Sequence, residues 1–210
     1  MKLYGISGLG ADQRVYQYLS LKNPLIVIEW IDPKVNESIE SYSKRLSRII
    51  NVEEEFGIIG VSFGGLVAVE ISKLLKPKIT ILISSVETKF ELRSIYRIIG
   101  KTHIIKVIPE NLFDPPRRIA NYIFGARNKE LLNQILNDTD VRFAKWALNE
   151  LVSWKNTGRL SNYTLKIEGA KDKLIPPTNS ENSKVIKNGG HFMVVDKADE
   201  ISRIINNELK

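Results

Sequence analysis

Short apolar runs alternate along the first part of the chain with longer stretches in which apolar residues recur every three or four positions. Runs such as Ile79 to Ile83, apolar at nearly every position, are typical of strands buried on both faces of a parallel sheet. The intervening helical spacing predicts repeated strand and helix. The expected strands are Leu3 to Ser7, Leu25 to Glu29, Phe56 to Val61 and Ile79 to Ser84, and the expected helices are Asp12 to Leu21, Glu37 to Ile50 and Gly64 to Lys76.

The alternation stops after Ser85, and the chain continues with helices and loops interrupted by Pro109, Pro115 and Pro116. A long helical pattern runs from Asp138 to about Lys155, with Asp138 or Thr139 as its expected N-cap. The alternation returns with a strand from Tyr163 to Glu168, a Pro176-Pro177 turn into a short helix, a strand from Lys184 to Ile186 and a helix from Ala198 to Leu209. We therefore expect an α/β core formed by residues 1–86 and 160–210, with a helical cap inserted at 87–159.

A serine lies between glycines in Gly60-Val61-Ser62-Phe63-Gly64, where an expected strand turns into an expected helix. This is the layout of a nucleophile elbow, in which the serine sits in a strained backbone at the tip of a sharp turn. Gly60, Gly64 and Gly65 lack the side chains that would collide where the helix passes the strand. Ser62 is the predicted nucleophile.

A serine hydroxyl needs a base to take its proton and an acid to orient that base. The chain has only two histidines, and His191 follows a glycine pair in a loop expected at the carboxyl edge of the sheet. His191 is therefore the predicted base, and His103 in the cap is interpreted as structural or solvated. Asp172, in the loop after the strand that ends at Glu168, is the predicted acid, with Glu87 as the alternative.

The oxyanion that forms when Ser62 attacks a carbonyl needs two backbone N–H donors. We expect one from Phe63, directly after the nucleophile, and one from Leu9 in the loop after the first strand. Gly8 and Gly10 make this loop flexible. The pair Gly8-x-Gly10 also imitates part of a dinucleotide-binding fingerprint, but Gln13 stands where the third glycine is needed. A nucleotide cofactor is therefore the weaker interpretation.

Composition narrows the possible chemistry. Among 210 residues there is no cysteine, which excludes a thiol nucleophile, a disulfide framework and a thiolate metal site. The N-terminus reaches glycines before an apolar signal core forms, and no run long enough to span a membrane occurs, so we expect a cytoplasmic protein without stable membrane association.

Charge is uneven along the chain. The formal net charge is +7, and residues 87–129 contribute nine basic and four acidic residues. Basic residues are not interleaved with aromatic residues as in a strand-binding groove, so no nucleic-acid partner is expected. A solvated face explains the basic cap more simply, and a preference for acidic substrates is the sharper hypothesis.

Three stretches resemble the α/β-hydrolase superfamily: the elbow around Ser62, Asp172 followed by Ile175-Pro176, and Gly190-His191-Phe192. A fourth, beginning at Ser7, resembles the family's His-Gly oxyanion loop with serine in place of histidine. The resemblance covers residues 1–86 and about 163–210 and does not extend to the cap. It implies a mostly parallel six-stranded sheet with helices on both faces, and no metal or organic cofactor.

The resemblance also implies an activity, the hydrolysis of a carboxylic ester or thioester of a small molecule through an acyl-serine. Relatives with an aspartate nucleophile cleave carbon–halogen bonds or epoxides, and Ser62 argues against both. Two alternatives remain: the same chemistry applied to a carbon–carbon, amide or lactone bond, and a ligand-binding or signalling protein that kept the fold without turnover.

Overall fold

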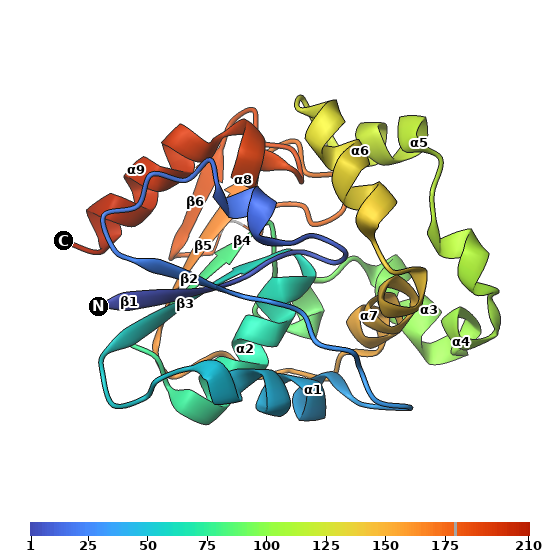
Figure 1. Cartoon of the computed structure of the whole chain (residues 1–210), viewed down its shortest axis with the longest axis horizontal. Coiled ribbons are helices and arrows are strands. Elements are labelled where there is room, and N and C mark those ends of the chain that lie inside the picture. The colour runs from blue at the N-terminus through green and yellow to red at the C-terminus, as the bar shows by residue number, and fades with distance from the viewer. Residues whose placement is uncertain (179) are drawn as a thin grey trace.

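A parallel sheet forms the centre of the protein in a computed structural model that describes residues 1–178 and 180–210, with only the backbone of Asn111 (Figure 1). Within these residues the sheet has six strands in the order β2-β1-β3-β4-β5-β6, all parallel, as the sequence predicts. The strands are β1 (Lys2–Ile6), β2 (Leu25–Ile28), β3 (Phe56–Val61), β4 (Ile79–Ile83), β5 (Tyr163–Gly169) and β6 (Ser183–Ile186).

Helices cover both faces of the sheet (Figure 1). Successive strand residues point to opposite faces, so Ile58 packs in the apolar cluster that includes α1 and α2, whereas Ile59 packs in the cluster that includes α8 and α9. Both residues are fully buried. The bounds of these helices are α1 (Ile39–Leu46), α2 (Phe63–Leu75), α8 (Met193–Asp196) and α9 (Ala198–Glu208).

The chain between β4 and β5 contains the remaining α-helices, which lie beyond one end of the sheet, to the right in Figure 1. We call residues 87–159 the helical segment. Its helix α7 contacts both α3 and α4 and also reaches α2 in the sheet layer. The bounds are α3 (Ser94–Thr102), α4 (Ile104–Val107), α5 (Arg117–Phe124), α6 (Lys129–Asp138) and α7 (Val141–Ser153).

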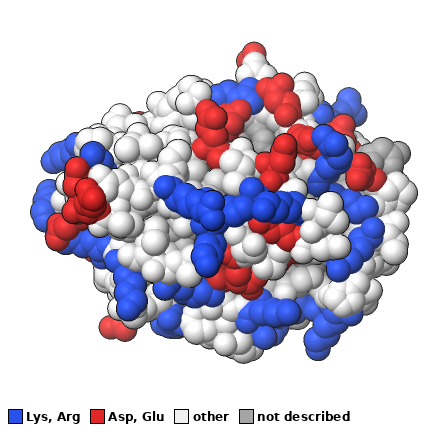
Figure 2. Space-filling model, turned by 60° about the horizontal axis from the view of Figure 1, so that its bottom comes forward, with Lys and Arg blue, Asp and Glu red and all other residues white. Residues whose placement is uncertain are grey.

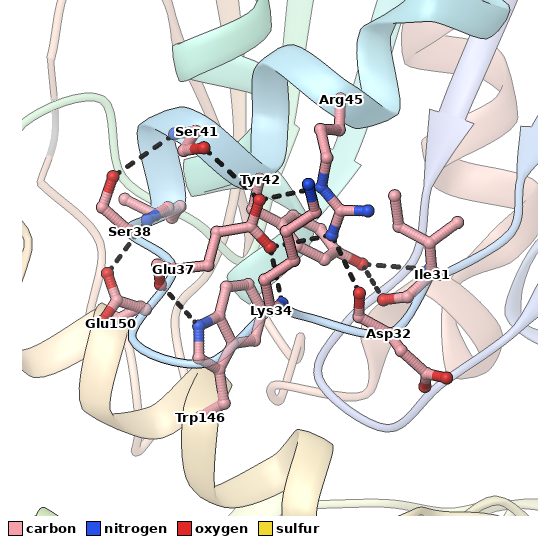
Figure 3. Close-up of polar contacts among 11 residues, drawn as sticks. Ile31, Asp32, Lys34, Glu37, Ser38, Ser41, Tyr42, Arg45, Trp146 and Glu150 are labelled. Carbon is pink, nitrogen blue, oxygen red and sulfur yellow. Dashed lines mark hydrogen bonds and ion pairs between the residues drawn. The ribbon is translucent and has the colours of Figure 1, made fainter.

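Helix α7 is joined to the loop before α1 by polar contacts (Figure 3). The indole Nε1 of Trp146 donates to the carbonyl of Glu37 at 2.8 Å, and a carboxylate oxygen of Glu150 accepts the N–H of Ile39 at 2.9 Å. The Glu37 carboxylate in turn forms an ion pair with Arg45 at 2.7 Å. These contacts fix α7 against the first turn of α1.

Strand order decides which loops meet. The chain passes from β2, on the outer side of β1, to β3 on its other side, so the loops that follow β1 and β3 emerge next to each other. In parallel sheets such a reversal leaves a crevice at the carboxyl ends of the strands. The loop of residues 7–12 and Ser62 therefore lie at the same edge.

The predicted helix from Asp12 to Leu21 is wrong. Only a 3-10 turn, η1 (Gln13–Tyr16), forms there. Beyond it, backbone N–H groups bond to side chains of α9 instead of continuing a helix: Ser20 donates to Ser202 Oγ at 2.9 Å and Lys22 donates to Asn206 Oδ1 at 2.8 Å. The apolar spacing of this stretch serves packing between η1 and the C-terminal helices.

The single helix predicted from Asp138 is also wrong at its start. Asp138 ends α6, and the N-cap of α7 is Asp140, whose carboxylate accepts the N–H of Arg142 at 2.7 Å and of Phe143 at 3.4 Å. Thr139 is extended, with φ −72° and ψ 125°, and separates the two helices. The N-cap is thus neither of the two residues expected, Asp138 and Thr139, but the aspartate that follows them.

A short helix expected after Pro177 does not form in the described residues before β6. The N–H and hydroxyl of Thr178 instead donate to Glu168 at 3.0 and 2.6 Å, which holds this stretch against β5. The described residues also form three other short 3-10 turns: η2 (Ser47–Ile49), η3 (Lys89–Glu91) and η4 (Glu110–Phe113). None of the described helices is long and apolar enough to cross a membrane.

Candidate active site

Ser62 occupies the turn between β3 and α2 with an unusual backbone for a residue that carries a side chain, φ 52° and ψ −122°. Such a conformation costs on the order of 1–3 kcal/mol and persists only where the surroundings enforce it. The N–H of Ser62 donates to the carbonyl of Ile83 at 2.9 Å, and its carbonyl accepts the N–H of Gly65 at 2.9 Å. The strand and the helix therefore hold the serine from both sides.

Two glycines allow α2 to pass this close. A Cβ on Gly60 would lie 2.5 Å from the Cα of Gly65, and a Cβ on Gly64 would collide with the carbonyl of Ser7. Glycine is therefore needed at positions 60 and 64 because the backbones pack closely there, and not because φ is positive. Gly8 differs, because a Cβ there would lie 3.5 Å from Ser62 Cβ, an ordinary contact, so space does not require glycine at that position.

His191 lies between Ser62 and Asp172. Its Nε2 is 2.8 Å from the hydroxyl of Ser62, and its Nδ1 is 2.8 Å from a carboxylate oxygen of Asp172. A carboxylate only accepts, so Nδ1–H donates to Asp172 and Nε2 is left to accept from the serine. The structure thus brings together three side chains that are 110 and 19 residues apart along the chain.

The carboxylate of Asp172 is held by its own loop. Its second oxygen accepts the N–H groups of Leu174 and Ile175, both at 2.9 Å. The N–H of Lys171 donates to the carbonyl of Gly189 at 2.8 Å and ties this loop to the one that carries His191. Asp172 and His191 are each 5% exposed, so their contact is shielded from water.

The alternative acid does not reach the histidine. The carboxylate of Glu87 accepts the N–H of Leu160 at 2.7 Å and joins the start of the helical segment to the residue that follows its end. Glu168, in β5, accepts from Thr178 and from Ser183. His103 is exposed in a left-handed turn between α3 and α4.

The loop after β1 presents a tight turn to Ser62. The N–H of Ala11 donates to the carbonyl of Gly8 at 3.0 Å, and Gly10 has φ +69°, as the third position of a type II turn requires. The Leu9 N–H belongs to the same peptide unit as the Gly8 carbonyl and points the opposite way. Neither it nor the Phe63 N–H donates to any acceptor within the described residues.

Side chains from three elements fix this loop without the histidine of the resembled family. The hydroxyl of Ser7 and the indole of Trp30 both donate to the carbonyl of Ala11, at 2.7 and 2.9 Å. The hydroxyl of Thr139, in the helical segment, lies 3.0 Å from the carbonyl of Gly10. Ser7 therefore supports this loop through its bond to the Ala11 carbonyl.

Sequence reasoning missed Ser85 as a support of the elbow. Its hydroxyl donates to the carbonyl of Ser62 at 2.7 Å, and it fills the space that a side chain on Gly65 would need. Ser85 is 1% exposed. The available signal was a hydroxyl directly after a buried strand that neighbours the elbow strand.

A cavity of about 320 Å³ opens from Ser62 into the helical segment. Val141, Ala144, Leu148 and Leu151 of α7 form part of its wall, and the aliphatic side chains of α6 and the ring of Phe124 add to it. Among the described residues the titratable side chains on its wall are Tyr96, Asp114 and His191, and Asp114 is paired with Arg117. The cavity is therefore largely apolar.

Three aromatic residues in and just after α7, Phe143, Trp146 and Trp154, do not line this cavity. The rings of Phe143 and Trp146 pack on Trp30, Tyr42 and Phe63, with centroid separations of 4.5 to 6.5 Å. The indole of Trp154 donates to the buried carboxylate of Glu70 at 2.8 Å. These residues join the helical segment to the sheet layer.

The basic side chains of the protein are distributed outside the cavity. No lysine or arginine contributes to the cavity wall in the described part of the chain. On the face shown in Figure 2, Lys and Arg side chains are spread over the surface and lie among Asp and Glu side chains. This distribution is that of a solvated surface.

Comparison with known proteins rests on structure alone, since no family profile and no curated protein matches the sequence. A thermophilic esterase from Thermogutta terrifontis is similar at a TM-score of 0.72 with 16% identity, over 100% of this chain and 89% of that one. A lipase-esterase related protein from Clostridium acetobutylicum reaches 0.70 with 16% identity, over 98% and 93%.

A meta-cleavage product hydrolase from Pseudomonas fluorescens is similar at a TM-score of 0.68 with 17% identity, over 100% of this chain and 92% of that one. Each likeness extends over nearly the whole of both chains, the helical segment included. Together with the parallel sheet, its strand order and the serine turn after β3, these likenesses show that the chain has the α/β-hydrolase fold.

Proposed function

We propose that the protein is a serine hydrolase that cleaves a carboxylic ester or thioester through an acyl-serine formed at Ser62. The observation that carries the proposal is the continuous pair of hydrogen bonds from Ser62 through His191 to Asp172, each 2.8 Å long. This is the geometry that a general base needs to activate a serine hydroxyl.

The reaction follows from these contacts. His191 Nε2 takes the hydroxyl proton as Ser62 Oγ attacks the carbonyl carbon, and the oxyanion is stabilised by the free N–H groups of Leu9 and Phe63. His191 then gives the proton to the leaving alcohol or thiol. Water enters, loses a proton to His191 and attacks the acyl-serine, which releases the acid and restores Ser62. Asp172 holds the imidazole and stabilises its charged form.

The cavity supports an uncharged, apolar acyl group. Its volume is about 320 Å³. A water molecule or a methylene group occupies roughly 30 Å³, so the cavity accommodates about ten non-hydrogen atoms. Such a chain meets aliphatic walls and no basic side chain. The hypothesis of an acidic substrate gains no support from this wall.

We further propose residues 87–159 as a cap that builds the acyl pocket over a core of residues 1–86 and 160–210. The similar proteins include an esterase and a lipase-esterase related protein, which agrees with ester chemistry on this fold. A meta-cleavage product hydrolase is also similar. The activity screen therefore includes, beside esters, the carbon–carbon, amide and lactone substrates of the alternative.

Labelling and turnover test the proposal together. A fluorophosphonate probe is expected to label Ser62 alone, and Ser62→Ala is expected to abolish labelling and lower kcat by roughly 10⁶ on p-nitrophenyl esters. Ser94→Ala, at an exposed position of α3, is the matched control and should behave as the wild type. Full activity in Ser62→Ala would exclude the mechanism, and specific ligand binding without labelling or turnover would favour the signalling alternative.

A further inference from the structure

The helical segment contacts the loop that is expected to stabilise the oxyanion. Thr139, between α6 and α7, places its hydroxyl 3.0 Å from the carbonyl of Gly10 and 2.8 Å from the carbonyl of Ile135. A hydroxyl has one proton, so these two carbonyls compete for it. The bond to Ile135 is an ordinary bond within the last turn of a helix, whereas the bond to Gly10 crosses between distant parts of the chain.

Packing reinforces this contact. A Cβ on Gly10 would lie 2.5 Å from the hydroxyl oxygen of Thr139 and 2.6 Å from its methyl carbon. Thr139 therefore rests directly on the backbone of Gly10, at the position with positive φ in the turn. Movement of Thr139 toward the loop is blocked, and movement away would release both the hydrogen bond and the packing.

A second contact joins the same two parts. Arg14, just after the loop, lies 2.7 Å from a carboxylate oxygen of Asp12 and 2.8 Å from one of Asp138, which directly precedes Thr139. Exposed pairs of this kind contribute little to stability. These pairs matter for position: Arg14 links Asp12, at the end of the loop, to Asp138, which precedes Thr139, and so keeps the two segments aligned at the Thr139 contact.

We propose that Thr139 is a positioning residue for the oxyanion hole: it holds Gly10 and the turn from Gly8 to Ala11 so that Leu9 N–H faces the oxyanion formed at Ser62. This inference rests on the proposed function. It goes beyond it because the helical segment, which lines the acyl cavity with the same Thr139, then also contributes to transition-state stabilisation.

Three full-length variants test the inference. Thr139→Val keeps the shape and loses the hydroxyl, and Thr139→Ser keeps the hydroxyl. Thr102→Val is the matched control, because Thr102 makes the same kind of helix-terminal bond, to the carbonyl of Ile99 at 2.7 Å, on the exposed end of α3. The readouts are kcat and KM on a p-nitrophenyl ester, affinity for a trifluoromethyl ketone, thermal unfolding, and hydrogen exchange of the Ala11 amide.

Thr139→Val is expected to lower kcat and the affinity for the trifluoromethyl ketone by about the same factor, on the order of tenfold, with KM unchanged, because only the transition state uses the hole. Exchange at Ala11 should accelerate. Thr139→Ser should restore most of these losses, and Thr102→Val should show none of them.

A purely structural role has a different signature. If Thr139→Val lowers the melting temperature but leaves kcat, inhibitor affinity and Ala11 exchange as in the wild type, the hydroxyl serves only Ile135 and the inference is wrong. If the wild type shows neither turnover nor fluorophosphonate labelling, the proposed hydrolase function fails instead. Hydrogen exchange of the Ala11 amide then tests separately whether Thr139 holds the turn. An exchange rate that is the same in Thr139→Val and the wild type would show that it does not.

Discussion

The sheet and the helical segment contribute to the candidate site in different ways. The side chains proposed to react come from loops at the carboxyl ends of β3, β5 and β6, where backbone hydrogen bonds hold each of them. The helical segment contributes the cavity wall and a contact from Thr139 to the loop of residues 7–12.

The sheet and the helical segment also differ in how deeply their side chains are buried. Every residue of β3 and β4 is buried, whereas the helical segment carries many exposed apolar side chains. A rigid, buried scaffold keeps reacting groups within narrow limits, while a less buried segment can vary the pocket without disturbing them. On the proposed function, the reacting side chains belong to the buried sheet layer, and the helical segment adds the pocket wall and the Thr139 contact. The exposed apolar residues of the segment are Phe90, Ile95, Ile98, Ile104, Val107, Leu112, Ile119 and Tyr122.

The largest effect that would sharpen this division concerns the acid. Asp172→Asn should lower kcat by about 10⁴, because an amide cannot hold His191 in the required tautomer. Steady-state kinetics on an ester identified by screening provide the measurement.

Glu87→Gln is the matched control, since Glu87 also follows a strand end but binds Leu160 N–H instead of the histidine. It should change kcat less than threefold or so while lowering stability through its buried contact. A large loss of kcat in Glu87→Gln with little loss in Asp172→Asn would reverse the assignment and move part of the chemistry to the helical segment.

A smaller effect concerns the acyl pocket. Leu148 of α7 lines the cavity and is half-buried, so Leu148→Trp should shorten the space available to a chain. We expect kcat/KM for a decanoyl ester to fall by about 100-fold and kcat/KM for an acetyl ester to stay within about twofold, because only the longer chain meets the new ring.

Leu112→Trp serves as the control, because Leu112 is an exposed leucine of the same segment outside the cavity. It should leave the ratio between decanoyl and acetyl esters unchanged. Equal losses for both esters in Leu148→Trp would show that the cavity does not hold the acyl chain.

The smallest expected effect is a change in the pH dependence of stability at the contact between α7 and the loop before α1. Glu37 and Glu150 lie close together in Figure 3, yet their pKa values move in opposite directions. Hydrogen bonds from Arg45 lower the pKa of Glu37 below the ordinary 4.5. Burial raises the pKa of Glu150 above that value.

The signs follow from proton linkage. Glu37 contributes stability above pH 4.5 that is lost as pH falls through its lowered pKa, so Glu37→Gln should cost most near neutral pH. For Glu150 the stability gained by taking up a proton is present below pH 4.5 and lost as pH rises through its raised pKa. The stability of Glu150→Gln relative to the wild type should therefore increase as pH rises, and the urea concentration at the unfolding midpoint measures it. Parallel pH profiles for both variants would contradict this assignment.

Several elements were predictable from local pattern. Strand β3, which ends at Ser62, and its neighbour β4 are apolar at almost every position. Such runs indicate strands that are buried on both faces of a sheet. The elbow was predictable because its glycines are required by steric contact over a few residues. The helix expected at Asp12 to Leu21 stops after η1, and near its expected end the N–H of Ser20 binds Ser202, far along the chain.

For this protein the sequence alone determined the parallel α/β architecture, the serine turn and a short list of bases and acids, since each depends on spacing or on residue scarcity. Only the tertiary structure showed that Asp172 contacts His191 whereas Glu87 binds Leu160, that the N-cap of α7 is Asp140, and that Ser85 and Thr139 lie at the candidate site. Those choices depend on contacts between residues far apart in the chain, which local pattern does not encode.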